Sequence, residues 1–279
     1  MRILKKHDYG PVTGYEFGWS PVGRPLMTAY VYRIGPVLID TAFAHVRKDI
    51  INILKADPPD SVFLTHHHED HGGNASAIKK RFNVPVYGHR LTAQKLEKKY
   101  RILPYQRLIW GAGEPVEVTP FDDKWEGMGF TLVPVHAPGH SKDHTVYLET
   151  RNGWLFSGDI YLGDRIRYFR SDEKIADQIT SIKKILSLDF EALFCGHNPR
   201  PEDGKKFLAR KLAFLEDFYG NVAALAIKGM EEKEIMHTLN LTEDRFILWL
   251  CFGNVSMKHM VRSVIDSLMD QQHFPSMPP

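Results

Sequence analysis

The sequence predicts an α/β fold followed by a helical C-terminal segment. Short apolar, β-branched runs alternate with helical periods between residues 37 and 99, a pattern typical of strands that pack against helices. Beyond about residue 204, helical periods dominate. The chain has 279 residues, which suits one large domain with a small appendage. We therefore predict a first domain over residues 1–203 and a helical cap domain over residues 204–279.

Residues 1–39 are expected to form strands and turns, with breaks at Gly10-Pro11 and Ser20-Pro21, and two runs within them are clearly strand-like. Residues 27–32 and 37–39 are rich in β-branched, aromatic and apolar side chains, and Gly35-Pro36 between them favours a hairpin turn. A helical period follows over residues 46–55, and the apolar run 61–64 predicts a buried strand. The same reasoning predicts helices at about 74–82, 91–99 and 172–186, and strands at 84–87, 115–119, 130–135, 146–148, 154–156 and 192–195.

Two segments are harder to assign. Residues 100–114 are partly aromatic with little periodicity, and they are either a loop that overhangs a site or a surface connection with buried aromatics. The C-terminal helices are expected at about 204–228, 231–239, 243–252 and 257–271. The middle two faintly resemble helix-turn-helix spacing, but residues 204–279 carry equal numbers of basic and acidic residues. Because a nucleic-acid reader needs a basic face, a cap over a cleft is the better interpretation.

Charge and composition exclude several classes of protein. The formal net charge is +2, so no global field attracts nucleic acid or membrane. No apolar run approaches the roughly 18 residues of a spanning helix, and residues 1–8 lack the apolar stretch of a signal peptide. The two cysteines, Cys195 and Cys251, give no disulfide framework, and we interpret Cys195 as core packing. We expect a cytoplasmic protein with neither a membrane nor a DNA partner.

The chemistry is concentrated in residues 65–73, which read Thr-His-His-His-Glu-Asp-His-Gly-Gly directly after the predicted strand 61–64. His66 and His68 are two residues apart, so in an extended chain both side chains point toward one cation. Asp70 and His71 follow where the chain turns, so they can face a second cation. An internal H-x-H-x-D-H run behind a buried strand therefore predicts a metal site.

Further short motifs accompany this run. They are Pro138-Gly139-His140, Phe156-Ser157-Gly158-Asp159, Cys195-Gly196-His197, and Asp40 after an apolar strand. Together with residues 65–73 they resemble, in the same order, the metallo-β-lactamase superfamily, the αββα hydrolases that bind zinc. The resemblance spans about residues 28–200. It implies a four-layer αββα sandwich, to which residues 204–279 add a helical extension.

The resemblance also implies a ligand set. His66, His68 and His140 would hold one metal, while Asp70, His71 and His197 would hold a second, with Asp159 bridging the two. Asp40 would support the ligand loop by hydrogen bonds, and His144 is interpreted as a residue that orients a ligand. Imidazole and carboxylate ligands suit two zinc ions, although iron and manganese are also accepted.

Such a centre predicts a hydrolase. Two metal ions lower the pKa of bound water toward neutrality and stabilise negative charge on the attacked group, and Asp70 is the residue expected to handle the proton. The bridging Asp159 distinguishes the chain from the name-giving β-lactamases, which generally lack it. His68 distinguishes it from the flavodiiron oxidoreductases, which carry Glu at that position. The ligands alone do not separate it from the persulfide dioxygenases.

Three functions are compared. The first is hydrolysis of a small-molecule thioester, ester or lactone, similar to glyoxalase II, with Arg200, Lys205 and Lys206 placed suggestively for substrate. The second is cleavage of single-stranded RNA, as in the β-lactamase-like endoribonucleases, with Arg165, Arg167 and Arg170 along the phosphate backbone. The third is a non-catalytic interaction protein in which metals only stabilise the fold. We favour the first, with a small molecule as the partner and RNA as the second choice.

Overall fold

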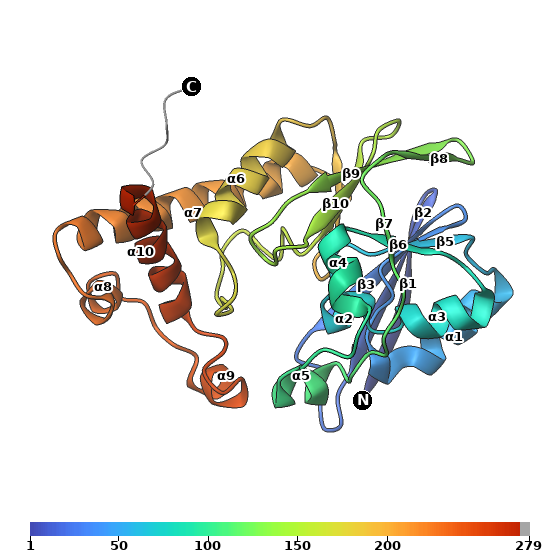
Figure 1. Cartoon of the computed structure of the whole chain (residues 1–279), viewed down its shortest axis with the longest axis horizontal. Helices are drawn as coiled ribbons and strands as arrows, with labels where there is room; N and C mark the ends of the chain where they lie inside the picture. The colour runs from blue at the N-terminus through green and yellow to red at the C-terminus, as the bar shows by residue number, and fades with distance from the viewer. Residues whose placement is uncertain (274–279) are drawn as a thin grey trace.

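Two β-sheets packed face to face form the centre of the molecule (Figure 1). This computed structural model describes residues 1–273. Helices cover the outer face of each sheet, and four further helices form the C-terminal segment. The predicted α/β class and αββα arrangement with a helical extension are therefore confirmed. Among the described residues, no helix is both long enough and apolar enough to span a membrane.

The first sheet runs β1 to β7 in sequence order. Its strands are β1 (Arg2–Tyr9), β2 (Val12–Trp19), β3 (Thr28–Ile34), β4 (Val37–Ile39), β5 (Ser61–Phe63), β6 (Val86–Gly88) and β7 (Thr119–Pro120). Strands β1 to β4 are antiparallel, and β4 to β7 are parallel. Because parallel strands end at one edge of the sheet, the loops after β4 and β5 lie side by side.

The second sheet has the order β12-β11-β10-β9-β8. Its strands are β8 (Trp125–Gly127), β9 (Phe130–His136), β10 (Thr145–Glu149), β11 (Trp154–Gly158) and β12 (Ala192–Cys195). All neighbours are antiparallel except β11 and β12. The loops after β9, β11 and β12 emerge at the edge that faces the β5 loop, as the contacts described below show.

Three layers of apolar side chains hold the sandwich together. Phe63 of the first sheet and Tyr147 and Phe156 of the second belong to the layer between the sheets, where Phe63 and Tyr147 meet edge to face at 5.5 Å. A second layer joins the first sheet to the helices α1 (Arg47–Ala56) and α3 (Ala75–Phe82). A third joins the second sheet to the C-terminal helices.

The remaining helices fill the connections. They are η1 (Ala44–Val46), α2 (Glu69–Gly72), α4 (Arg90–Leu96), α5 (Pro104–Ile109), α6 (Ile175–Leu186), α7 (Gly204–Ile227), α8 (Glu232–Thr238), α9 (Arg245–Leu250) and α10 (Met257–His273). Most predicted elements are found close to their predicted bounds. Two predictions need correction, in segments 100–114 and 115–119.

Segment 100–114 was predicted without a helix but contains α5. Pro104 is the first residue of this helix, where its fixed φ suits the start, and the Leu103 amide donates to Gln106 Oε1 at 2.7 Å. Segment 115–119 was predicted as a strand, yet only Thr119–Pro120 pairs in the sheet. Val116 instead donates its amide to the Leu96 carbonyl at 2.8 Å, so its apolar character reflects packing against α4.

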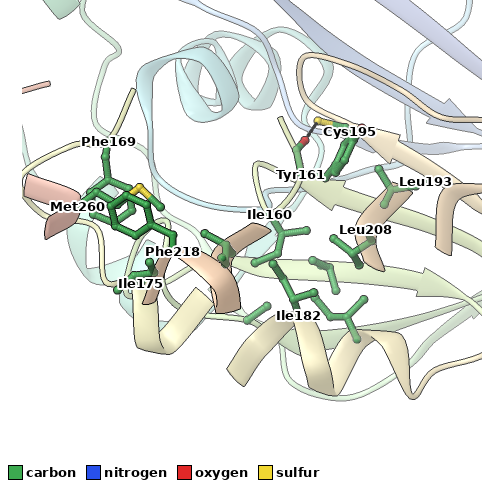
Figure 2. Close-up of a cluster of buried hydrophobic side chains, with 14 of the residues drawn as sticks. Ile160, Tyr161, Phe169, Ile175, Ile182, Leu193, Cys195, Leu208, Phe218 and Met260 are labelled. Atoms are coloured by element: carbon green, nitrogen blue, oxygen red, sulfur yellow. Dashed lines mark hydrogen bonds between the residues drawn. The ribbon is translucent and has the colours of Figure 1, made fainter. Parts of the chain in front are cut away.

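The first helix of the C-terminal segment is part of the core. Leu208 and Leu215 of α7 pack with Ile182 of α6 and Leu193 of β12, and Figure 2 shows this layer around Ile160 and Ile182. Cys195 is fully buried there, and its thiol donates to the Tyr161 carbonyl, so the interpretation of Cys195 as core packing is confirmed. The division at residue 203 stays a prediction, and residues 274–279 of the predicted second domain lie outside the described residues.

Candidate metal centre

The histidine-rich motif lies at the edge of the first sheet, between β5 and α3. His66 follows β5 by three residues, His68 precedes the single turn α2, and Asp70 and His71 lie on that turn. All four side chains are buried, although each carries a polar or ionisable group. Buried groups of this kind need partners, so their surroundings define the site.

Three imidazoles converge in the first cluster. His66 Nε2 lies 2.8 Å from His68 Nδ1, and His140 Nε2, from the loop after β9, lies 3.0 Å from the same atom. The three nitrogens lie within 4.8 Å of one another. This is the predicted three-histidine set, assembled from both sheets.

A second cluster lies beside the first and mixes imidazole with carboxylate. His71 Nε2 lies 3.2 Å from Asp159 Oδ1, and His197 Nε2 lies 3.1 Å from Asp70 Oδ2. The four ligand atoms of Asp70, His71, Asp159 and His197 again lie within 4.8 Å. Asp159 and His197 come from the loops after β11 and β12, so this set too joins the two sheets.

Asp159 lies between the clusters. Its Oδ2 atom is 3.3 Å from His197 Nε2 in the second cluster and 3.4 Å from His140 Nε2 in the first. One carboxylate therefore faces both sets of donors. The structure brings all seven predicted ligands together at one place, and the arrangement is consistent with a dinuclear site.

Some polar atoms of the site are buried without a hydrogen-bond partner, and bound metal ions would supply one. His71 Nε2 and Asp159 Oδ1 lie 3.2 Å apart, yet both are buried and neither makes a hydrogen bond. Such atoms are costly to bury unsatisfied, and a divalent cation would satisfy those that face a cluster. Burial and the charge of His71 lower the pKa of His66, so His66 is a neutral donor suited to a cation.

Each of four histidines in the two clusters has an oxygen atom at its other ring nitrogen. In the second cluster, His71 Nδ1 lies 2.7 Å from Asp40 Oδ2, and His197 Nδ1 lies 2.5 Å from the Thr28 carbonyl oxygen. In the first cluster, His66 Nδ1 lies 3.0 Å from Thr65 Oγ1, and His140 Nδ1 lies 3.3 Å from Glu173 Oε1. These contacts fix the ring orientation and leave the facing nitrogen free to bind a cation. Glu173 and Thr28 were not predicted, since they lie far from their histidines in sequence.

Asp40 supports the motif from the neighbouring strand. Its Oδ1 atom accepts the Thr65 amide at 2.8 Å, and the residue takes a left-handed backbone with φ of 62°. A left-handed non-glycine residue carries strain, so its interactions must compensate. Asp40 thus ties the β4 loop to the β5 loop and to His71, in the place the resemblance implied.

His144 contacts the site through the backbone. Its Nε2 atom accepts the Asp159 amide at 2.9 Å, which holds the residue that lies between the clusters. Burial and the charge of His140 lower its pKa to about 3, so it is neutral and able to accept. The structure therefore shows His144 positioning Asp159, consistent with the predicted orienting role.

Sequence reasoning missed the part played by Asp143. Its carboxylate accepts the His67 amide at 2.9 Å, His67 Nδ1 at 2.8 Å and Thr92 Oγ1 at 2.8 Å. His67 lies in the ligand motif but points away from both clusters, and Lys95 Nζ lies 3.0 Å from its Nε2 atom. Asp143 therefore anchors the motif to the loop of the second sheet. The only sequence signal was its nearness to His140.

A cavity of about 260 Å³ opens beside the clusters. Its wall includes Tyr105 and Trp110 from the α5 region and Ile247 and Leu250 from α9, together with ligands from both clusters. Of the two interpretations of residues 100–114, the overhanging segment is the one the structure supports. Helix α9 of the C-terminal segment contributes to the same wall.

The basic residues considered for substrate lie in different settings. Arg170 lines the cavity, whereas Arg165 and Arg167 are exposed. Arg200 stacks over the Phe207 ring at 4.3 Å, and Lys205 Nζ donates to the Leu188 carbonyl at 2.7 Å. Neither of these two lines the cavity, and Lys206 does not line it either.

The fold and the two clusters define a class. The chain belongs to the metallo-beta-lactamase superfamily, whose family model matches residues 27–197. It is 34% identical over 116 residues to a hydroxyacylglutathione hydrolase of Bdellovibrio bacteriovorus, covering 41% of this chain and 40% of that protein. It is 30% identical over 200 residues to a beta-lactamase-like protein 2 homolog of Drosophila melanogaster, covering 64% and 62%.

Solved structures agree on the fold. A metallo-beta-lactamase family protein from Thermus thermophilus superposes with a TM-score of 0.64 at 17% identity, covering 93% of this chain and 94% of that one. A metallo-beta-lactamase from Pontibacter korlensis gives a TM-score of 0.62 at 18% identity, covering 78% and 100%. The chain spans less than two thirds of the length of these two curated relatives, so the family is established by the family model and these relatives carry no activity over to the chain.

Proposed function

We propose that this protein is a dinuclear metal-dependent hydrolase that acts on a thioester, ester or lactone. The observation that carries the proposal is the position of Asp159, whose carboxylate faces both ligand clusters beside the cavity. Names of relatives support the acyl chemistry, because several sequences similar to this chain, from Bdellovibrio and Salmonella, are called hydroxyacylglutathione hydrolase. Zinc is the proposed metal, since neutral imidazole with carboxylate suits it.

The residues of the site have separable tasks. Two bound divalent cations would supply a hydroxide nucleophile near neutral pH and stabilise negative charge on the attacked carbonyl oxygen. Asp70 lines the cavity and is ionised, because His71 and His197 lower its pKa although burial alone would raise it. It can therefore accept a proton from the nucleophile and pass it to the leaving group. Asp40, Glu173 and His144 keep the site in place through the contacts described above.

The test compares substrates on one preparation. Zinc-loaded protein is assayed against glutathione thioesters, lactones and single-stranded RNA. The test variant is Asp70→Ala, and the matched control is Asp122→Ala, which removes an exposed carboxylate instead. We expect acyl turnover that Asp70→Ala lowers by at least about 100-fold. Acyl turnover that survives Asp70→Ala would contradict the assigned role. No turnover with two metals bound would favour the third function, a metal-stabilised interaction protein.

Cleavage of single-stranded RNA is the second candidate function, and one surface favours it. A shallow cavity of about 650 Å³, separate from the one beside the clusters, has a lining that includes the basic side chains Arg2, His45, Arg47, Lys48, Lys99 and Arg107. Asp49 pairs with Arg2 at 3.2 Å and Glu114 with Arg47 at 2.7 Å, which leaves Lys48, Lys99 and Arg107 to attract phosphate. RNA cleavage in the assay above, lost in Asp70→Ala, would establish this function in place of acyl hydrolysis.

A further inference from the structure

The cavity beside the clusters presents mainly carbon to whatever enters it. Apart from the metal-cluster residues, its apolar wall is built from the β2–β3 loop, the α5 region, the segment after β11, and α9 with the segment that follows it. The side chains are Leu26, Met27, Ile109, Trp110, Leu162, Ile247, Leu250, Cys251 and Val255.

The polar groups of the wall are already engaged with the protein. The Arg170 guanidinium makes a two-point contact with Asp172, at 3.0 and 3.2 Å, which neutralises its charge. The Tyr105 hydroxyl donates to Asn254 Oδ1 at 2.8 Å, and Gln106 Nε2 donates to Glu69 Oε2 at 3.1 Å. Tyr105 therefore has no donor left and Gln106 has one, while Arg170 keeps three N–H groups on a guanidinium whose charge is offset by Asp172.

The other two polar wall residues are engaged in the same way. The Tyr168 hydroxyl donates to Asp244 Oδ2 at 3.2 Å. Glu173 accepts from Gln178 Nε2 at 2.7 Å and faces His140 Nδ1 at 3.3 Å. A charged group placed in this cavity would lose its water and meet, in Arg170, a cation already paired with Asp172, which is poor compensation, whereas a hydrocarbon group would gain from burial along most of the wall.

The apolar wall continues to the molecular surface. Leu26, Met27 and Leu162 line the cavity and are also exposed, at 59%, 41% and 37% of their surface. An acyl chain whose carbonyl lies at the clusters can therefore extend outward along side chains that stay in contact with it. Apart from Arg170, which is paired with Asp172, the wall offers no charged end point at which a short hydroxylated or carboxylated acyl group would be recognised.

From these contacts we propose that the site is specific for acyl substrates whose acyl part is an extended apolar group. This inference rests on the proposed acyl hydrolysis and adds the substrate class to it. The reaction splits the bond between the acyl carbon and its sulfur or oxygen, and water supplies the hydroxyl of the carboxylate product and the proton of the leaving thiol or alcohol.

The first experiment varies the acyl chain on a constant thiol leaving group. Acetyl, butanoyl, hexanoyl and octanoyl thioesters are compared with a suberoyl thioester, which has the length of octanoyl but ends in a carboxylate. We expect kcat/KM to rise by about fourfold for each methylene that enters the cavity, and the suberoyl substrate to lose most of that gain. A flat profile with sustained turnover would overturn the inference and leave the proposed hydrolysis standing.

A binding measurement covers the case of no turnover. Metal-loaded protein is titrated calorimetrically with octanoate, butanoate and suberate. Octanoate binding at least tenfold more tightly than either of the others supports the inference even when no thioester in the panel is a substrate. Equal affinities for the three acids overturn it, independently of whether the protein is a hydrolase.

Paired variants on α9 locate the effect. Ile247→Asp places a charge in the wall, and we expect it to lower the ratio of octanoyl to acetyl kcat/KM at least tenfold. Trp249→Asp is the matched control, because Trp249 is 74% exposed on the same helix and does not line the cavity. Ile247→Leu should keep the ratio near that of the wild type. An equal loss in Ile247→Asp and Trp249→Asp, with unchanged circular dichroism, would overturn the assignment of this wall.

Discussion

Asp143 and His67 show how a buried pair can hold a ligand loop without binding metal. Lys95 donates to His67 Nε2, so this nitrogen accepts and His67 Nδ1–H donates to Asp143. The His67 amide and Thr92 hydroxyl complete the coordination of the carboxylate. His67 is thereby held between His66 and His68, and its backbone cannot shift without moving both.

Asp143→Asn is expected to lower the free energy of unfolding by about 2–3 kcal/mol at pH 7, because charge-assisted hydrogen bonds are replaced by weaker ones and an amide N–H₂ meets donors. Zinc affinity should also fall, since His66 and His68 lose a fixed loop. Urea unfolding and zinc titration measure the two effects. Asp122→Asn, at an exposed position, is the control, and an equal loss of stability there would contradict the role given to Asp143.

The same pair gives a pH dependence. Burial alone would raise the pKa of Asp143, but the contacts from His67 and Thr92 and the Lys95 charge outweigh it and lower the pKa below the usual 3.8. A carboxyl with a lowered folded-state pKa stabilises the fold above pH 3.8 and loses this contribution as the pH falls further. The difference in stability between wild type and Asp143→Asn should therefore be full at pH 5 and shrink below about pH 4. Urea unfolding at several pH values checks this, and a difference that grows in acid would refute it.

The distribution of ligands along the chain explains why sequence reasoning reached the clusters but not their supports. His66, His68, Asp70 and His71 occur within six residues, so their spacing alone indicates chemistry. The partners of His140 and His197 are Glu173 and the Thr28 carbonyl, and those contacts depend on how distant loops meet. A backbone carbonyl has no sequence signature at all.

At the scale of the element, helix α7 supports the metal centre through a buried lysine, Lys211. Lys211 is 2% exposed, and its Nζ atom donates to the Ile160 carbonyl at 2.7 Å, directly after Asp159. The C-terminal segment thus supports the loop that carries the residue between the clusters. Helical period predicted α7 from its sequence, but not that a lysine would lie on its buried face.

Lys211→Met gives a second pH prediction. Burial lowers the pKa of Lys211, although Glu173 opposes the shift, so the folded protein releases this proton at a lower pH than the unfolded chain. Below the folded-state pKa, the fold bears the full free-energy cost of burying the charged lysine. This cost declines as the pH rises toward 10.5. Wild type should therefore gain stability relative to Lys211→Met as the pH rises from the folded-state pKa toward 10.5, by at most about 1.4 kcal/mol per pH unit. Thermal or urea unfolding across this range tests it, and an opposite slope would refute it.

A side-chain hydrogen bond joins α5 to the segment that follows α9. The Tyr105 hydroxyl of α5 donates to Asn254 Oδ1, four residues after α9 ends. No residue of α9 is fully buried, so this helix has little packing of its own to hold it. Sequence patterns predicted α9 but could not show that it faces α5.

Tyr105→Phe should loosen this side of the cavity while keeping the fold. We expect faster amide hydrogen exchange over residues 245–250 and a loss of about 1 kcal/mol or less in unfolding free energy. Tyr219→Phe is the matched control, because its hydroxyl contacts Ser267 Oγ at 2.8 Å between α7 and α10, away from the cavity. If Tyr105→Phe and Tyr219→Phe change amide exchange in α9 equally, the Tyr105 hydrogen bond is not what holds α9 in place.

At the scale of the whole molecule, the clusters join the two sheets. The first sheet supplies His66, His68, Asp70 and His71 through the loop after β5, and the second supplies His140, Asp159 and His197 through three loops. Bound metal would therefore connect the two halves of the sandwich directly, and the stability of the entire fold should depend on it.

Metal binding should also displace protons. Burial alone would lower the pKa values of His71 and His197, but the Asp159 carboxylate and its neighbours outweigh it and raise both. In the metal-free protein these imidazoles are protonated at neutral pH, and a cation can bind only after the protons leave. Zinc binding should release more than one proton per chain and tighten as the pH rises. Calorimetry in two buffers of different ionisation enthalpy measures the release, and a value near zero would contradict the second cluster as a metal site.

Zinc should raise the melting temperature of the protein, and the rise should be smaller in a variant that lacks a metal ligand. At free zinc about 1,000-fold above Kd, loading contributes about 4 kcal/mol, or on the order of 10 °C for a chain of this size. Asp159→Ala removes the carboxylate that faces both clusters, so its melting temperature should rise by less than half as much. Asp164→Ala, which removes a carboxylate that contacts the Tyr161 hydroxyl, should respond to zinc like wild type. Because both sheets supply ligands, differential scanning calorimetry should show a single unfolding transition that zinc moves to higher temperature. If two transitions are seen and zinc shifts only one of them, the metals stabilise only one sheet.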